Sequence, residues 1–77
     1  MFQATRVFET AKTLDQNFKL YQDFFARQGW NILLISNQDK LKSISAAKGR
    51  LRVQITINEN TITKVKTVDI SLTELPK

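Results

Sequence analysis

The sequence has no cysteine and no histidine, and it has only two glycines and one proline. The lack of cysteine excludes disulfides and thiolate zinc sites, and the lack of histidine removes the commonest general base and metal ligand. The seven acidic residues form no close-spaced pair and no Asp-x-Asp cluster that would suit a divalent metal ion. The sequence therefore predicts no enzyme activity, no catalytic or metal-binding residue and no cofactor.

Long apolar runs are also missing. Residues 32–35 form the longest one, and they fall far short of the ~20 residues that span a bilayer. The N-terminus lacks the basic region and long apolar stretch of a secretion signal. We therefore expect no membrane segment, and the cytoplasm is the default location.

The chain is short and basic. Its 77 residues suffice for a single domain, residues 1–77, because a second core would have too little apolar surface. One core of this size gives marginal stability, which small domains often raise with a disulfide, a metal or a partner chain. A partner is the remaining option, so we expect self-association or binding to another protein. The formal charge of +5 favours an acidic partner.

One amphipathic helix is predicted over residues 13–29. Thr13 and Gln16 have the spacing of a capping box, in which each side chain bonds the other residue's backbone N–H. Asp15 in the first turn suits the positive end of the helix dipole. Apolar residues then recur at helical spacing and predict the buried face: Leu14, Phe18, Tyr21 and Phe25.

Gly29 and Trp30 predict how this helix ends. A glycine just after a helix adopts a left-handed conformation without a Cβ penalty. The next residue commonly packs back on the third-last helical position, which pairs Trp30 with Phe25. A structural role therefore explains Gly29 and Trp30 better than a binding role does. Lys48 and Gly49 read as a hairpin turn, so no phosphate-binding loop remains and no small-molecule substrate is evident.

Residues 30–72 have the pattern of an antiparallel meander. Residues 50–58 alternate strictly between apolar and polar side chains, which is the strongest strand signal in the chain. Turn-forming residues separate the predicted strands, and the lysines of the last strand break its alternation. We expect turns at residues 37–40, 48–49 and 59–60, and a bulge or bend near residues 63–67.

The ends of the chain complete the predicted fold. Residues 1–12 form a short strand or an extended segment, and residues 73–77 form a tail. The fold class is α+β, with one helix on one face of a four- or five-stranded antiparallel meander, (β)αββββ.

The predicted turns also fix the strand pairing. A turn at residues 48–49 places Ala46 opposite Leu51, so apolar residues face apolar ones. A turn at residues 59–60 places Ile57 opposite Ile62.

An apolar patch is predicted on the sheet face away from the helix. If Ile32 and Leu34 face the helix, Leu33 and Ile35 face away from it, beside Leu41 on the neighbouring strand. One account is that the N-terminal segment folds over this patch. The other account is a partner, either a second copy or a different protein, because contiguous exposed apolar patches mark contact surfaces. We predict Leu33, Ile35 and Leu41 as a protein interface.

These observations predict a small non-catalytic protein-interaction module, acting as an adaptor, an inhibitor or a regulatory subunit, that forms a homodimer. The alternative is a nucleic-acid-binding protein that holds phosphates on its solvated sheet face. Stacking aromatics, which sheet modules for single-stranded RNA use, are not expected on that face. The residues of this alternative site are Lys42, Lys48, Arg50, Arg52, Lys64 and Lys66.

Overall fold

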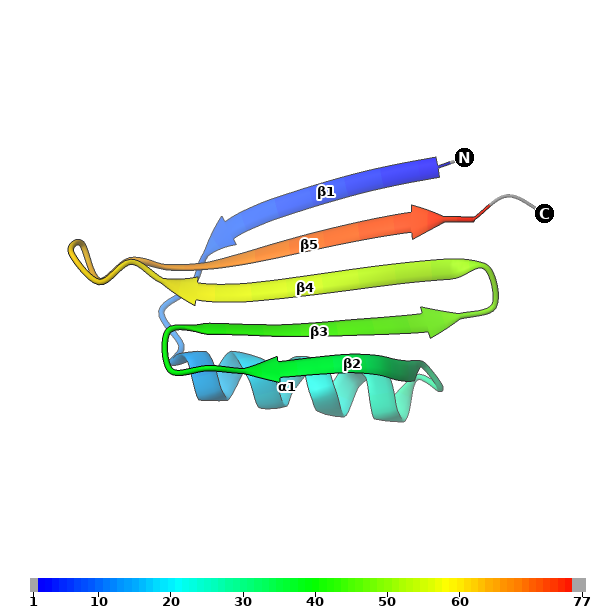
Figure 1. Cartoon of the computed structure of the whole chain (residues 1–77), viewed down its shortest axis with the longest axis horizontal. Helices are drawn as coiled ribbons and strands as arrows, with labels where there is room; N and C mark the ends of the chain where they lie inside the picture. Colours follow the sequence, from blue (N-terminus) through cyan, green and yellow to red (C-terminus); the bar gives the residue numbers. More distant parts are fainter. Residues whose placement is uncertain (1, 76–77) are drawn as a thin grey trace.

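The computed structural model describes residues 2–75, which form one helix and one five-stranded sheet (Figure 1). The strands are antiparallel in the order β1-β5-β4-β3-β2, and this arrangement confirms the predicted α+β fold. No helix of the described chain is both long enough and apolar enough to cross a membrane. In chain order the elements are β1 (Phe2–Glu9), α1 (Leu14–Arg27), β2 (Asn31–Asn37), β3 (Leu41–Lys48), β4 (Leu51–Glu59) and β5 (Lys66–Glu74).

Both ends of α1 form as the sequence predicts. Thr13 Oγ1 accepts a hydrogen bond from the Gln16 N–H at 3.1 Å, and Gln16 Oε1 accepts one from the Thr13 N–H at 2.8 Å. After the helix, Gly29 has a φ of +78°, and the Trp30 N–H donates to the Phe25 carbonyl at 2.9 Å. This is the outer bond of a Schellman motif. It brings the Trp30 ring to 5.6 Å from the Phe25 ring, as predicted.

The core lies between α1 and one face of the sheet. Leu14, Phe18 and Phe25 of the predicted helical stripe are buried, and Tyr21 is half-buried at its edge. α1 packs on β3 and β4, with a smaller contact on β2. The sheet side of the core consists of alternate residues on neighbouring strands: Ile44 and Ala46 of β3, Val53, Ile55 and Ile57 of β4, and Val68 of β5.

The hairpin between β3 and β4 turns one residue later than predicted. Lys48 pairs with Leu51, so Gly49 and Arg50 form the turn, and Ala46 lies opposite Val53 rather than Leu51. The register therefore differs from the predicted one by two residues. Because strand side chains alternate with a period of two, this shift leaves the apolar residues of β3 and β4 on the face that their alternation predicts.

A β-bulge reverses the predicted orientation of the second half of β2. The register shifts between Ile32 and Leu34, so Ile32 and Ile35 share the face of the β3 core residues while Leu34 lies opposite Ser45. The prediction that Ile35 faces away from the helix side is therefore wrong, because the extra residue changes the alternation. Leu33, in the bulge, is 53% exposed.

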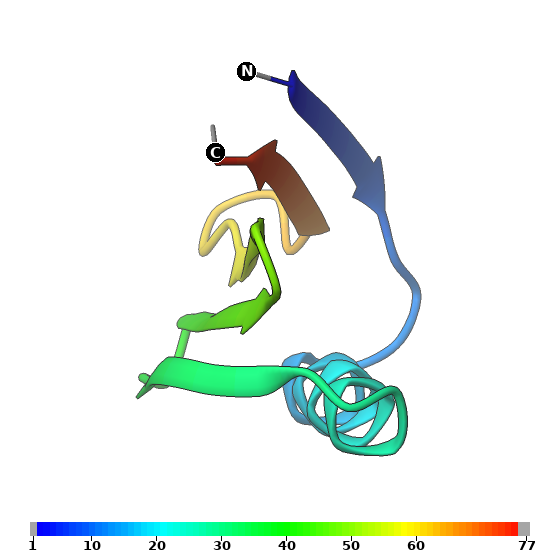
Figure 2. The ribbon, with the colours of Figure 1, turned by 90° about the vertical axis from the view of Figure 1, so that its right-hand side faces the viewer.

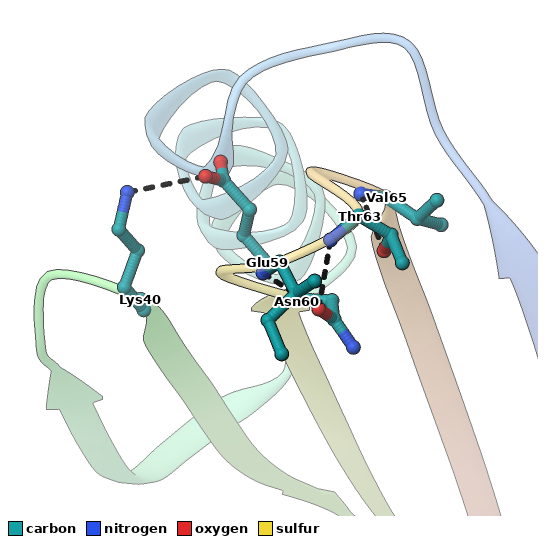
Figure 3. Close-up of polar contacts among 6 residues, drawn as sticks. Lys40, Glu59, Asn60, Thr63 and Val65 are labelled. Carbon is teal, nitrogen blue, oxygen red and sulfur yellow. Dashed lines mark hydrogen bonds and ion pairs between the residues drawn. The ribbon is translucent and has the colours of Figure 1, made fainter.

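The connection between β4 and β5 is a loop rather than the predicted two-residue turn (Figure 3). Asn60 Oδ1 accepts hydrogen bonds from the N–H groups of Ile62 and Thr63 at 2.9 and 3.0 Å, and Lys64 has a left-handed φ of +63°. The predicted irregularity is thus a gap of six unpaired residues, 60–65, between β4 and β5. The pairing of the two strands begins after this gap, with Glu59 opposite Lys66. The predicted contact of Ile57 with Ile62 is wrong.

The other prediction for β5 concerns its end. Thr73 and Glu74 belong to the strand, opposite Arg52 and Leu51 of β4, where the sequence predicted the start of a tail. Residues 76–77 of that tail lie outside the described residues.

An ion pair at the base of this loop links the β2–β3 turn to the end of β4 (Figure 3). Lys40 Nζ lies 3.1 Å from Glu59 Oε2, and the Glu59 N–H donates to the Lys40 carbonyl at 3.1 Å. The hydrogen bond from Lys40 lowers the pKa of Glu59, and the same bond raises the pKa of Lys40. Both shifts favour the charged forms that make the pair.

Candidate functional site

A groove runs along one side of α1, between the helix and the part of the sheet that the helix leaves uncovered. It has a volume of about 400 Å³, and almost all the atoms that line it are apolar. Figure 2 views the molecule along its strands, with the sheet curving so that β1 and α1 lie on opposite sides of its open concave face. We call this cavity the α1 groove. Its lining residues are Leu20, Tyr21, Phe24, Phe25, Arg27, Trp30, Val53, Ile55 and Ile70.

A second stripe on α1 forms the helical wall of the groove. Leu20, Phe24 and Arg27 recur at spacings of four and three residues, which places them on one side of the helix beside the buried stripe. Leu20 and Phe24 are each 42% exposed, and the Phe24 ring lies 5.7 Å from the ring of Phe25. The Schellman motif sets Trp30 at the end of this wall.

The floor of the groove comes from one rung of the sheet and the residue beside it. Ile55 and Ile70 are opposite each other on β4 and β5, and Val53 is the next residue of β4 on the same face. Ile55 is buried under α1, whereas Ile70 is only half-buried because α1 packs on β2, β3 and β4. The apolar face of the sheet thus extends beyond the helix that covers it.

The total exposed surface is larger than the average for a protein of this mass. The chain exposes 5293 Å² at a mass of 8.9 kDa. A folded monomer of that mass exposes about 4,800 Å² on average. An exposed surface above the average is expected for a domain whose single helix covers only part of one sheet face.

Two arginines carry positive charge beside the groove, and the hydroxyl of Tyr21 lies on its helical wall. Arg6 lies opposite Ile70 in the β1–β5 pairing, on the same face of the sheet, and its Cζ is 5.5 Å from the centre of the Phe8 ring. Burial of the Tyr21 hydroxyl raises its pKa, and the positive charge of Arg6 offsets part of that rise. Among the described residues, Arg27 is the only charged one that lines the groove.

Of the predicted protein-interface residues, Leu33 and Ile35 lie on the edge strand β2, opposite the β1 edge of the sheet, and Leu41 begins the neighbouring strand β3. Leu33, Ile35 and Leu41 are 53%, 40% and 42% exposed, and Leu34, which was expected in the core, is 65% exposed. They do not share one face, because Leu33 borders a shallow hollow on the solvated face while Ile35 pairs with Ile44 on the helix side. β1 pairs with β5, so the N-terminal segment does not cover them.

The six predicted basic residues do not form one surface. Lys42 is 5% exposed on the helix side of β3, where its Nζ contacts Asp15 at 3.2 Å and the Gln38 carbonyl at 3.2 Å. The prediction that Lys42 contributes to a basic site on the solvated face is therefore wrong. The other five lie apart from one another. Lys48 donates to the Gln28 carbonyl at the end of α1, Arg52 donates to the carbonyls of Gly49 and Leu51, and Arg50 lies 3.9 Å from Glu74. Lys64 lies in the β4–β5 loop, and Lys66 lies on the helix side of β5.

Sequence reasoning missed the α1 groove. The spacing of Leu20, Phe24 and Arg27 was the available signal, because it marks a second apolar stripe beside the first. The floor residues Ile55 and Ile70 gave no such signal, since their alternation is that of any strand facing a core.

Comparison with known families gives one match. A family model described as START domain-like matches residues 3–69, which include every lining residue of the α1 groove except Ile70. The match indicates a small ligand-binding-like domain. No curated protein and no solved structure matches the chain.

Proposed function

This chain belongs to the START domain-like family, and on that premise we propose that it is a non-catalytic domain that binds one small apolar molecule in the α1 groove. The observation that carries the proposal is the lining of the groove, which presents almost only apolar atoms to a space of about 400 Å³. Binding sites for small molecules are concave and mostly apolar, with volumes of about 300 to 1,000 Å³.

The energetics of the groove support the same proposal. Water in contact with its apolar walls makes few hydrogen bonds to the protein, and an apolar ligand would release it. Each Å² of apolar surface removed from water contributes roughly 25 cal/mol. A slender ligand with an alkyl chain would contact α1 on one side and the sheet on the other.

The single tryptophan of the chain provides a direct probe of this groove. Trp30 lines it, so its fluorescence spectrum should shift when an apolar ligand displaces water. We expect 1-dodecanol to produce a saturable change. At about 0.3 kcal/mol or more for each non-hydrogen atom, its Kd would be about 1 mM or tighter.

A carboxylate on the wall of the groove should weaken binding. Phe24→Asp places a charge that prefers water against the ligand, and we expect the affinity for 1-dodecanol to fall about tenfold or more. Ile62→Asp is the matched control, because Ile62 is 89% exposed in the β4–β5 loop, outside the groove. Equal affinities of the wild type and Phe24→Asp would contradict the proposal.

Self-association is a second candidate function, and one observation favours it. β2 is an edge strand that exposes three consecutive apolar residues, Leu33, Leu34 and Ile35. Edge strands with exposed apolar side chains pair readily with another strand. We propose a second copy of the chain as the partner at this edge, in line with a role as an adaptor, an inhibitor or a regulatory subunit.

Sedimentation equilibrium tests this candidate. The wild type is expected to dimerise at high micromolar concentration, and Leu33→Asp is expected to shift it to a monomer while its circular dichroism spectrum stays unchanged. A wild type that remains a monomer throughout would contradict self-association and leave the ligand proposal standing. The nucleic-acid alternative gains no support from the scattered positions of its basic residues.

A further inference from the structure

We infer that the ligand of the α1 groove is a single-chain amphiphile with an anionic head group, held at the mouth of the groove by Arg6 and Arg27. The inference rests on the proposed function, and it names the chemical class of the ligand. It follows from charge complementarity between an apolar cavity and the cationic side chains on its two sides.

Arg27 supplies the positive charge on the α1 side. Its side chain lines the groove, yet almost none of the lining atoms are polar. The aliphatic stem of Arg27 therefore forms part of the wall, and its guanidinium group extends beyond the wall towards solvent. A head group at that end would meet a planar cation with paired N–H donors, which match the geometry of a carboxylate or a phosphate.

Arg6 supplies the positive charge on the β1 side. It lies opposite Ile70, a residue of the groove floor, and stacks over Phe8 on the same face of the sheet. Its positive charge lowers the pKa of the Tyr21 hydroxyl on the helical wall, against the rise that burial causes. Arg6 thus faces the concave side of the sheet, across the groove from α1.

Neither of these two arginines is held in an ion pair among the described residues. None of the lining residues is acidic. Among the described residues the ion pairs are Lys40–Glu59, Lys42–Asp15 and Arg50–Glu74, and neither Arg6 nor Arg27 takes part in one. The groove therefore combines an apolar interior with two arginines at its border that form no ion pair, which suits an alkyl chain that ends in an anion.

The test compares two probes that share the same alkyl chain, dodecanoate and 1-dodecanol, in titrations followed by Trp30 fluorescence. We expect the wild type to bind dodecanoate about three- to tenfold more tightly, as charge-assisted hydrogen bonds at a partly solvated site allow. The preference should shrink as salt is added, because ions screen exposed charges.

Variants assign the preference to the two arginines. Arg6→Gln and Arg27→Gln should each reduce the preference for dodecanoate over 1-dodecanol about threefold, whatever the change in 1-dodecanol affinity that shortening the Arg27 stem in the groove wall causes. The double variant should bind both probes equally. Lys19→Gln is the matched control, because Lys19 lies one turn after Asp15, on the side of α1 that contacts Lys42 and away from the groove.

The outcomes separate this inference from the proposal on which it rests. Saturable binding of both probes with equal affinity, or a preference that survives in the double variant, would overturn the anionic head group and leave the apolar ligand in place. Failure of both probes to bind the wild type would overturn the proposed function itself. An equal loss of preference in Lys19→Gln would show that net charge, rather than Arg6 and Arg27, attracts the anion.

Discussion

Phe25→Ala is expected to lower the free energy of unfolding by about 3 to 5 kcal/mol. Phe25 is 2% exposed, packs against Trp30 at 5.6 Å between ring centres, and forms part of the core and of the groove wall. Its removal leaves a cavity where the end of α1 meets the sheet. Domains of this length have a total stability of roughly 4 to 12 kcal/mol. Urea denaturation followed by circular dichroism should therefore find a much lower unfolding midpoint, and at the low end of this range the variant is close to unfolding without denaturant.

Phe24→Ala is the matched control for that experiment. The same side chain is removed from the neighbouring position, where Phe24 is 42% exposed. Because less apolar surface returns to water and no closed cavity forms, we expect a loss of no more than about 1.5 kcal/mol. Losses of similar size in the two variants would contradict the position of Phe25 in the core.

Lys42→Ala has the second-largest expected effect, a loss of about 2 to 3 kcal/mol in the free energy of unfolding. Lys42 is almost fully buried, with its Nζ 5.7 Å from the centre of the Phe18 ring and hydrogen-bonded to Asn37 Oδ1 and the Gln38 carbonyl. Its ion pair with Asp15 joins the start of α1 to β3. Truncation removes both the polar contacts and the packing of the aliphatic stem.

Lys42→Met separates packing from charge. Methionine keeps an unbranched chain against Phe18, and Asp15, Asn37 and Gln38 are exposed enough to bond water instead. We expect a loss of less than about 1 kcal/mol, since the Asp15 carboxylate that loses its partner is exposed to water and does not become a buried unpaired charge. A loss as large as that of Lys42→Ala would mean that the charge stabilises this site. A loss below about 0.5 kcal/mol in Lys42→Ala would contradict its burial.

Local sequence signals predicted the helix well because its ends are made by neighbouring residues. The bonds between Thr13 and Gln16 span three positions, and those around Gly29 span five. Such contacts form whatever the rest of the chain does. The faces of β3 and β4 were also predictable, because alternation survives a register shift of two.

Two errors have a physical cause that alternation alone does not reveal. The bulge in β2 inserts one residue and so moves Ile35 to the helix side, although every residue near it is apolar and gives no sign of the insertion. The β4–β5 loop is built by the side chain of Asn60 and a left-handed Lys64, where a two-residue turn at Glu59 and Asn60 looked sufficient.

The burial of Lys42 was within reach of the sequence. Lys42 shares its phase with Ile44 and Ala46, so strict alternation already places it on the helix side of β3. The α1 groove was harder to predict, because it depends on how much of the sheet one helix covers. That depends on sheet curvature and on the position of α1 over β3 and β4, which are tertiary properties.

The most direct test of the apolar ligand in the α1 groove is to locate a bound probe by NMR. With 1-dodecanol and methyl-labelled protein, the proposal predicts nuclear Overhauser effects from the alkyl chain to the Ile55 and Ile70 methyl groups and to the Trp30 indole. Effects confined to Leu33, Leu34 or Ile62, or none at saturating 1-dodecanol, would contradict it.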